Sequence, residues 1–263
     1  MARSGEFIGF PPGLLGPGPY RLPLLRNRKN WFALYKPPYL LARAHPWHAE
    51  CPDLTLGIKS QLTRGKPELQ PLGIKGVYFV SGPEYEVGGP AIFAKNKEAS
   101  DHWRNALGSD QFTFSFWGLS TGTWDRVTRQ CHLPVARHHR ENRVVISRKT
   151  GKKSYTFFDE LGKLPPYLLW RARARNPRLH QVRIHAAESG LPILGDDLYG
   201  SGRVDPATVE PTWARRALSR IRGLALFLRE VHLPAQMKEK TPVAADLPRG
   251  FANFLRKTGL AIG

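Results

Sequence analysis

The alternation of apolar and polar residues predicts strands in the middle of the chain. In residues 167–174 (YLLWRARA), apolar side chains share one face, and Arg171 and Arg173 lie on the other, because successive side chains of a strand point to opposite faces. In residues 111–120 (QFTFSFWGLS), three phenylalanines ending at Phe116 recur at every second position. This spacing predicts an inward-facing apolar side for that strand.

Proline and glycine divide the chain. Trp31–Tyr35 predicts a strand that ends at Pro37, because proline has no N–H to donate to a β-ladder. Residues 1–29 contain GFPPGLLGPGPYRLP, which predicts an extended Pro/Gly-rich arm on the surface. The tail at 236–263 ends in FANFLRKTGLAI, which predicts a docking helix or a frayed terminus. We expect the main domain at 30–235.

Composition points to a polyanionic partner. The 263 residues are 41% hydrophobic, enough for one sizeable core, and 40 Lys+Arg against 21 Asp+Glu give a formal charge of +19. Such a charge favours nucleic acid, because basic side chains neutralise phosphates and release counterions. A diffuse solubilising charge is the alternative, but the basic residues cluster at 136–143, 147–153, 171–178 and 215–222.

The cysteines and histidines predict neither a disulfide framework nor a zinc site. Cys51 and Cys131 are far apart and have no CxxC spacing. Residues 45–53 (HPWHAECPD) hold several metal-ligating types, but no second ligand pair follows, so we expect a loop. The chain has no apolar run of membrane-spanning length and no signal-type N-terminus. We expect a cytoplasmic protein without membrane association, with membrane-surface binding of the basic residues as the alternative.

Residues 178–200 (RLHQVRIHAAESGLPILGDDLYG) combine alternating basic and apolar residues with a turn rich in Gly and Pro. We expect a strand end or a short helix followed by a rigid loop. We expect His180, Arg183 and His185 to face one way and Val182 and Ile184 to point inward. The plainer interpretation is a buried strand with a charged edge.

This segment resembles the signature of the RluA-like family of RNA pseudouridine synthases, G-R-x-H-Q-[LIV]-R-[VI]-H followed by G-x-P-I-x-G-D and Y-G, except that Pro177 replaces the first glycine. Lys36 and Pro37 match the Lys-Pro pair near the start of the family's catalytic domain. The resemblance covers about residues 30–235. It implies a mixed α/β (α+β) fold, with a twisted, mainly antiparallel sheet, peripheral helices and a central basic cleft. The segment before residue 30 is too short for an S4 RNA-binding domain.

The resemblance places Glu84 at the family's catalytic aspartate. Aligned on Ala94 and Lys95, residues 81–84 (SGPE) occupy the family's H-R-L-D. There a carboxylate acts on a flipped-out uridine as nucleophile or as base. Phe116 occupies the position of the family's active-site tyrosine, so it can stack on a base but cannot transfer a proton.

The resemblance also implies roles for basic residues. Arg183 would pair with Glu84 and keep its carboxylate ionised, or else serve as a phosphate ligand or in a structural ion pair. Six residues are candidate RNA contacts: Lys36, Arg171, Arg173, Arg178, His180 and Gln181.

Two further carboxylates need weighing. Asp196, together with Tyr199, is expected to lock the loop after the motif. Asp125 imitates the family's D-R-x-T but comes too late in the chain, so we interpret it as a turn residue, with the catalytic aspartate as the minor alternative.

The leading hypothesis is therefore a monomeric isomerase that acts on rRNA or tRNA without a metal or an organic cofactor. The alternative is a catalytically inactive RNA-binding or ribosome-assembly relative that kept the cleft. A protein whose basic surface binds other anions is a third class, which the motif disfavours.

Overall fold

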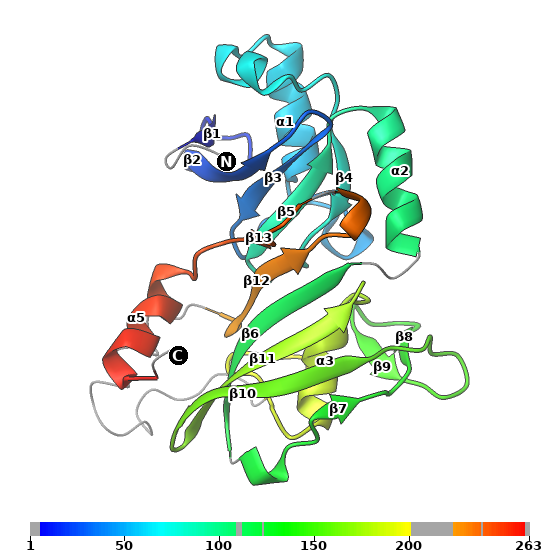
Figure 1. Ribbon diagram of the computed structural model, residues 1–263, viewed down its shortest axis with the longest axis vertical. Helices are drawn as coiled ribbons and strands as arrows, with labels where there is room; N and C mark the ends of the chain where they lie inside the picture. Colours follow the sequence, from blue (N-terminus) through cyan, green and yellow to red (C-terminus); the bar gives the residue numbers. More distant parts are fainter. Residues whose placement is uncertain (1–5, 109–111, 123, 201–222, 238, 261–263) are drawn as a thin grey trace. The chain divides into compact units, whose positions relative to one another are not determined.

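The computed structural model describes residues 6–108, 112–122, 124–200, 223–237 and 239–260 (Figure 1). The chain forms two compact units. The first contains residues 1–112 and 230–245, and the second contains residues 113–229 and 246–263. The predicted main domain at 30–235 includes parts of both units. In the described part of the chain, none of the helices has the length and apolar character needed to cross a bilayer.

The first unit is built on an antiparallel sheet of five strands in the order β1-β2-β3-β5-β4. Their bounds are Phe7–Phe10, Tyr20–Asn27, Trp31–Lys36, Gly89–Ala94 and Tyr78–Ser81 for β1, β2, β3, β5 and β4. The helices of this unit are α1 (Leu54–Thr63), α2 (Lys97–Gly108), and the 3-10 turns η1 (Pro46–His48), η2 (Pro67–Leu72) and η5 (Ala235–Met237). The prediction of a strand at Trp31–Tyr35 is confirmed.

The expectation of a surface arm at residues 1–29 is wrong for residues 7–10 and 20–27. These residues form β1 and β2, and their alternate apolar side chains, such as Phe10 and Leu22, belong to the core beneath the sheet. Pro23, by contrast, points outward and is exposed. Ladder hydrogen bonds and apolar burial against β3 therefore outweigh the local preference of the Pro/Gly-rich sequence.

The second unit has its own antiparallel strands in the order β6-β11-β10-β7, with the first residues of β12 beside β6. Their bounds are Thr113–Thr121, Tyr167–Arg175, Thr156–Leu164, Gln130–Cys131 and Leu226–His232 for β6, β11, β10, β7 and β12. A hairpin of β8 (Val135–Arg137) and β9 (Val144–Ile146), the 3-10 turn η3 (Trp124–Arg126) and the helices α3 (Gln181–Glu188) and α5 (Arg249–Thr258) complete the unit. The end of β12 pairs with β13 (Val243–Ala244) in the first unit.

The strands predicted from alternation are confirmed in β6 and β11. Phe116 is 7% exposed and Trp170 is fully buried, so the apolar face points inward as expected. Gly118 on β6 leaves room for Trp170, because a Cβ at Gly118 would lie 2.1 Å from the indole ring. The indole Nε1 donates a hydrogen bond to the Ser120 hydroxyl at 2.9 Å.

The prediction of an alternating segment at residues 180–184 is wrong. Of the two forms we expected, the short helix is correct: α3 begins at Gln181, after His180 in the left-handed conformation at φ 54°. Every residue from Gln181 to Ala186 is buried, so no polar face is left to the solvent. The docking helix expected in the tail is α5, where Phe254 contacts Tyr167 with ring centroids 5.5 Å apart.

Candidate functional site

Glu84 lies in the connection between β4 and β5 of the first unit, and its side chain is half-buried. The connection runs close to β5, because a Cβ at Gly82 would lie only 3.0 Å from the Cα of Ala91. The backbone N–H of Val87 donates to the carbonyl of Glu84 at 3.2 Å. These contacts fix the loop backbone at the position that carries the Glu84 carboxylate.

Lys36 fixes this loop from inside the first unit. Its ammonium group donates to the carbonyls of Pro37, Leu40 and Tyr85 at 3.0, 2.8 and 3.1 Å, and the residue is fully buried. Burial lowers the pKa of Lys36 to about 7, although the charges of Glu86 and Glu84 act to raise it. The structure gives Lys36 a role other than the predicted RNA contact: it anchors the backbone next to Glu84.

Tyr85 adds aromatic contacts to this anchor. Its ring stacks on His48 at 4.1 Å and meets the Tyr39 ring edge-on at 5.8 Å. The Tyr39 N–H donates to the Tyr85 carbonyl at 2.7 Å. Burial, followed by the neighbouring Cys51, raises the pKa of Tyr85 to about 12. The residue after Glu84 is thus held by its backbone and by its ring, and the hydroxyl stays protonated at neutral pH.

In the second unit, Arg183 forms a buried ion pair with Asp196. The Nε and Nη2 atoms donate to the two carboxylate oxygens at 2.9 and 2.8 Å. Burial by itself would raise the pKa of Asp196, but the hydrogen bonds and charge of Arg183, together with the N–H groups of Leu198 and Tyr199, lower it. Asp196 also caps its own loop through these two N–H groups, so the loop lock expected for Asp196 is confirmed.

His180 and Tyr199 extend this network. The Nη1 atom of Arg183 lies 3.3 Å from the Nε2 atom of His180, and the His180 Nδ1 atom lies 3.0 Å from the Tyr199 hydroxyl. Since arginine can only donate, His180 accepts at Nε2 and carries its proton at Nδ1. The Tyr199 oxygen also accepts the N–H of Val144 at 2.7 Å. The loop after the motif is thereby tied to β9, and the loop lock expected for Tyr199 is confirmed.

Gln181 and His185 tie α3 to β10 through Thr156. The Gln181 amide donates to the Thr156 hydroxyl at 3.1 Å, and its oxygen accepts the N–H of Arg178 at 3.0 Å. His185 donates from Nε2 to the carbonyl of Leu133 at 2.8 Å, so its Nδ1 accepts from Thr156. Burial lowers the pKa of His185, which favours this neutral form.

Three of the six predicted RNA contacts are thus interior residues. Lys36, His180 and Gln181 are each at most 3% exposed and bond to protein groups. Arg171, Arg173 and Arg178 remain available to an RNA, with at least partly exposed side chains on or just after β11. The basic cluster at 215–222 lies outside the described residues.

The three predicted catalytic residues occur in both units. Glu84 belongs to the first, and Phe116 and Arg183 belong to the second. The pairing of Glu84 with Arg183 therefore stays a prediction. Asp125 is an exposed residue of the single turn η3, as expected for a turn aspartate.

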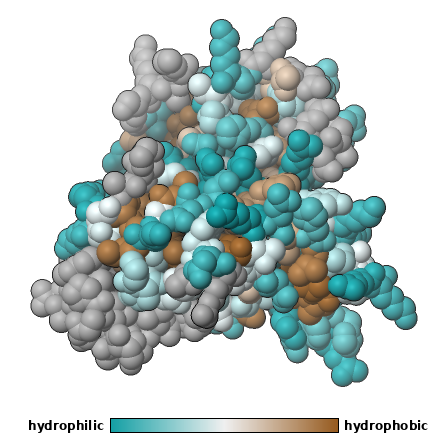
Figure 2. Space-filling view, turned by 60° about the horizontal axis from the view of Figure 1, so that its bottom comes forward, coloured by the Kyte–Doolittle hydropathy of each residue, from teal (hydrophilic) through white to brown (hydrophobic). Residues whose placement is uncertain are grey.

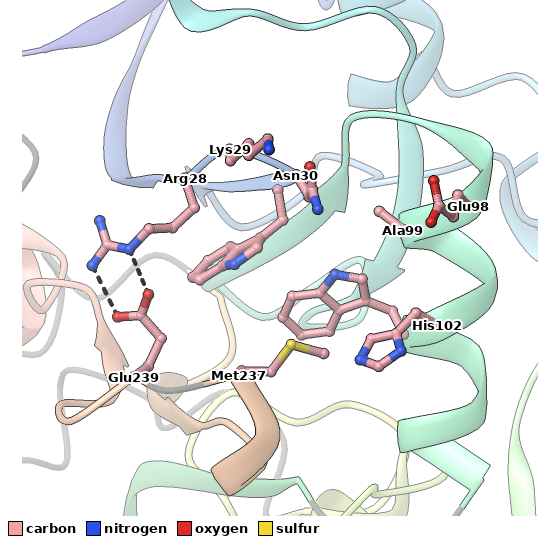
Figure 3. Close-up of a pocket in the computed structure, with 10 residues that line it drawn as sticks. Arg28, Lys29, Asn30, Glu98, Ala99, His102, Met237 and Glu239 are labelled. Atoms are coloured by element: carbon pink, nitrogen blue, oxygen red, sulfur yellow. Dashed lines mark hydrogen bonds and ion pairs between the residues drawn. The ribbon is translucent and has the colours of Figure 1, made fainter.

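The sequence did not indicate a cavity of about 460 Å³ in the first unit (Figure 3). Trp31 and Trp103 meet edge-on at 5.4 Å and form its apolar floor with Met237. Arg28 reaches across to Glu239 in the bidentate pair drawn in the figure. Tryptophans spaced far apart in the sequence carry no signal for such a cavity, because α2 and η5 bring its walls together only in the fold.

No protein-family model matches the chain. Among curated proteins, the chain is 28% identical over 165 residues to ribosomal large subunit pseudouridine synthase C of Vibrio vulnificus, which covers 63% of this chain and 49% of that protein. It is 30% identical over 118 residues to ribosomal large subunit pseudouridine synthase D of Haemophilus ducreyi, which covers 45% and 36%. The matches thus span half or less of the length of these two relatives.

Solved structures agree with the sequence matches. Human RNA pseudouridylate synthase domain containing 4 superposes with a TM-score of 0.66 at 19% identity, covering 90% of this chain and 92% of that one. Human RNA pseudouridylate synthase domain containing 1 gives 0.60 at 18% identity, covering 86% and 84%. The fold is therefore that of pseudouridine synthases. The resemblance to the RluA-like family that the motif predicts is confirmed.

Proposed function

We propose that this chain, a relative of the RluA-like pseudouridine synthases, isomerises a uridine of a structured RNA, either rRNA or tRNA, to pseudouridine. The reaction breaks the bond from C1′ of the ribose to N1 of uracil and forms a bond from C1′ to C5. The proton leaves C5 and a proton is gained at N1, so the product is an isomer of the substrate. No oxidant or reductant is needed.

The observation that supports this proposal best is the anchoring of the loop that carries Glu84. Burying an ammonium group costs several kcal/mol unless its hydrogen bonds are satisfied. Lys36 satisfies them by donating to three backbone carbonyls. One of these belongs to Tyr85, the neighbour of Glu84. Catalysis depends on a reacting group that is held in place. A buried lysine that anchors the backbone next to Glu84 therefore supports a catalytic role for its carboxylate.

In this proposal Glu84 attacks the ribose or base of the flipped-out uridine, or removes a proton from it. Arg183 donates to the carboxylate of Glu84 from the edge that Asp196 leaves, while Asp196 holds the guanidinium in one orientation. Phe116 offers a ring face for the base but no hydroxyl. The proton of C5 must therefore go to Glu84 or to water.

Phe116 also favours the second candidate function, that of an RNA-binding relative without catalysis. The side chain is only 7% exposed and has no group that transfers a proton. Such a protein would bind the same RNA and leave its uridines unchanged.

Tritium release tests the proposal. RNA transcripts of rRNA and tRNA, tritiated at C5 of uridine, lose tritium to water when pseudouridine forms. We expect release by the wild-type protein and none by Glu84→Gln, which keeps the shape of the side chain and removes its charge. Asp125→Asn is the matched control, because this exposed aspartate imitates the family motif, and it should release tritium at the wild-type rate.

Binding without release by the wild-type protein would establish the second candidate. Tritium release that persists in Glu84→Gln and is lost in Asp125→Asn would identify Asp125, and not Glu84, as the catalytic carboxylate.

A further inference from the structure

Two exposed aromatic rings lie at the start of β10, Phe157 within the strand and Tyr155 just before it. Thr156 points toward α3, where it bonds Gln181 and His185. Since successive side chains of a strand alternate, Phe157 lies on the opposite face. Tyr155 and Phe157 are 48% and 41% exposed, respectively.

Basic and aromatic side chains surround these two rings. The ring of His132 lies 4.9 Å from Tyr155 and 6.2 Å from Phe157, measured between centroids. Arg173 stands directly opposite Phe157 in the register of β10 and β11, and Arg171 lies two residues before it on the same face. We call Tyr155, Phe157, His132, Arg171 and Arg173 the aromatic–arginine face.

The arginines leave this face positively charged. Both bond the single carboxylate of Asp159, with nitrogen–oxygen distances of 3.1 Å for Arg171 and 3.1 Å for Arg173. Two guanidinium groups against one carboxylate leave one positive charge in excess. Their side chains are 39% and 49% exposed, so they can reach a ligand without breaking a buried contact.

These side chains differ from ordinary core residues. Phe158, which points the other way, is 2% exposed and packs against Trp170 at 5.6 Å. The visible face of the molecule in Figure 2 is mostly hydrophilic, with small hydrophobic areas between the polar side chains. We therefore expect the ligand of this exposed aromatic pair and its neighbouring arginines to have both flat apolar faces and negative charge.

Single-stranded RNA has this chemistry. Its unpaired bases stack on aromatic rings, and its phosphates bind arginine, as on the sheet faces of known RNA-binding modules. In double-stranded RNA the bases are stacked within the helix and offer no free face. Tyr155 and Phe157 are two residues apart, so their Cα atoms are about 7 Å apart along an extended strand, and each ring can take a separate base.

We propose that the aromatic–arginine face binds a single-stranded segment of the substrate RNA. Two neighbouring bases stack on Tyr155 and Phe157, and the phosphates lie beside Arg171 and Arg173. This inference rests on the proposed function only in taking RNA as the substrate, and it does not depend on whether Glu84 is catalytic.

Fluorescence anisotropy with a short, end-labelled oligouridylate tests this proposal. The double variant Tyr155→Ala and Phe157→Ala should weaken binding by about 5- to 150-fold for each base that loses its ring. The dependence of affinity on salt should stay unchanged, because stacking releases no counterions. The backbone carbonyl of Tyr155, which accepts from Gln181, is kept in this variant. Thermal unfolding should therefore match that of the wild type.

Phe7→Ala is the matched control. Phe7 is also 41% exposed and has an arginine, Arg21, 3.5 Å from its ring, but it belongs to the first unit. It should bind the oligouridylate like the wild type. Arg173→Gln should act differently from the ring variants and reduce the slope of log affinity against log salt by about 0.7.

Unchanged affinity of the double variant, or an equal loss of affinity for a blunt RNA duplex, would overturn the inference. Glu84→Gln separates this outcome from a failure of the proposed function. In the Glu84→Gln background, Tyr155→Ala and Phe157→Ala should weaken binding by the same factor as in the wild type, even though that background releases no tritium. Stacking-dependent binding by a wild-type protein that never releases tritium would refute the isomerase and leave the RNA face in place.

Discussion

Arg183 donates two parallel hydrogen bonds to Asp196, and both side chains are almost completely buried, at 3% and 0% exposure. A bidentate pair of this kind fixes the orientation of the guanidinium plane as well as its position. In an RluA-like site, where the motif arginine is expected to meet the catalytic carboxylate, Asp196 would determine which edge of Arg183 remains for Glu84.

Asp196→Asn should be strongly destabilising. The asparagine oxygen can still accept the N–H groups of Leu198 and Tyr199, so the change removes mainly the charge that balances Arg183. We expect a loss of about 3–5 kcal/mol in the free energy of unfolding, because a buried cation is left uncompensated. Urea unfolding measures it.

Asp159→Asn is the control for this prediction. Asp159 also bonds two arginines, but its side chain is 34% exposed. Its replacement should cost no more than about 1 kcal/mol. Equal losses in the two variants would contradict a special role for the buried pair.

Lys36 should make the stability rise with pH above neutrality. Burial lowers its pKa from 10.5 to about 7, so between these values the unfolded chain binds a proton that the folded chain has released. The free energy of unfolding should increase across this window by up to about 1.4 kcal/mol per pH unit. Below pH 7 both states bind the proton, and this group contributes no slope.

Urea unfolding of the wild type and of Lys36→Met, measured at several pH values between 7 and 10, isolates this effect. Other groups titrate in both proteins, so the difference between the two curves reports Lys36. Parallel curves would show that the buried amine keeps an ordinary pKa.

Phe116→Tyr should raise the rate of tritium release if the chain isomerises uridine. If Phe116 occupies the position of the family's tyrosine, as the motif predicts, the substitution restores its hydroxyl, and a well-placed acid–base group contributes at least about 10²-fold. Phe114→Tyr is the matched control, because Phe114 lies two residues earlier on the same buried face of β6. Equal rates for the wild type and Phe116→Tyr would mean that proton transfer does not pass through this position.

Gly118→Ala should destabilise the second unit. The added methyl group would lie 2.1–2.6 Å from three atoms of the Trp170 indole, which is fully buried and cannot move aside without disturbing β11. We expect a loss of at least about 1–3 kcal/mol. In Gly18→Ala the methyl group meets nothing within 4 Å, so thermal unfolding should change little.

Several strands could be predicted because their signal is local. In β11 an apolar residue recurs at every second position, and a strand with one buried face requires this period whatever it packs against. The same period holds for the phenylalanines of β6, whereas β3 was predicted from an apolar run that ends before Pro37. The motif at 178–200 likewise indicated the resemblance to the RluA-like family and the fold that the solved structures share.

Other features depend on partners that are distant in the sequence. Residues 7–10 and 20–27 flank the Pro/Gly-rich stretch of an expected irregular arm, yet they form β1 and β2 because β3 supplies the ladder and the core supplies the burial. Over residues 181–186, the spacing of apolar and polar residues could not distinguish a strand from a helix, because all of these side chains are buried.

The sequence by itself determined the resemblance to the RluA-like family, the alternating strands and the residue types at the candidate site. Only the tertiary structure decided what those side chains do. A lysine or an arginine has the same charge in any sequence, and its role follows from burial. Lys36 became an internal anchor because three carbonyls surround it, and Arg183 gained Asp196 as its partner. Arg173 stayed on an exposed face where a phosphate can reach it.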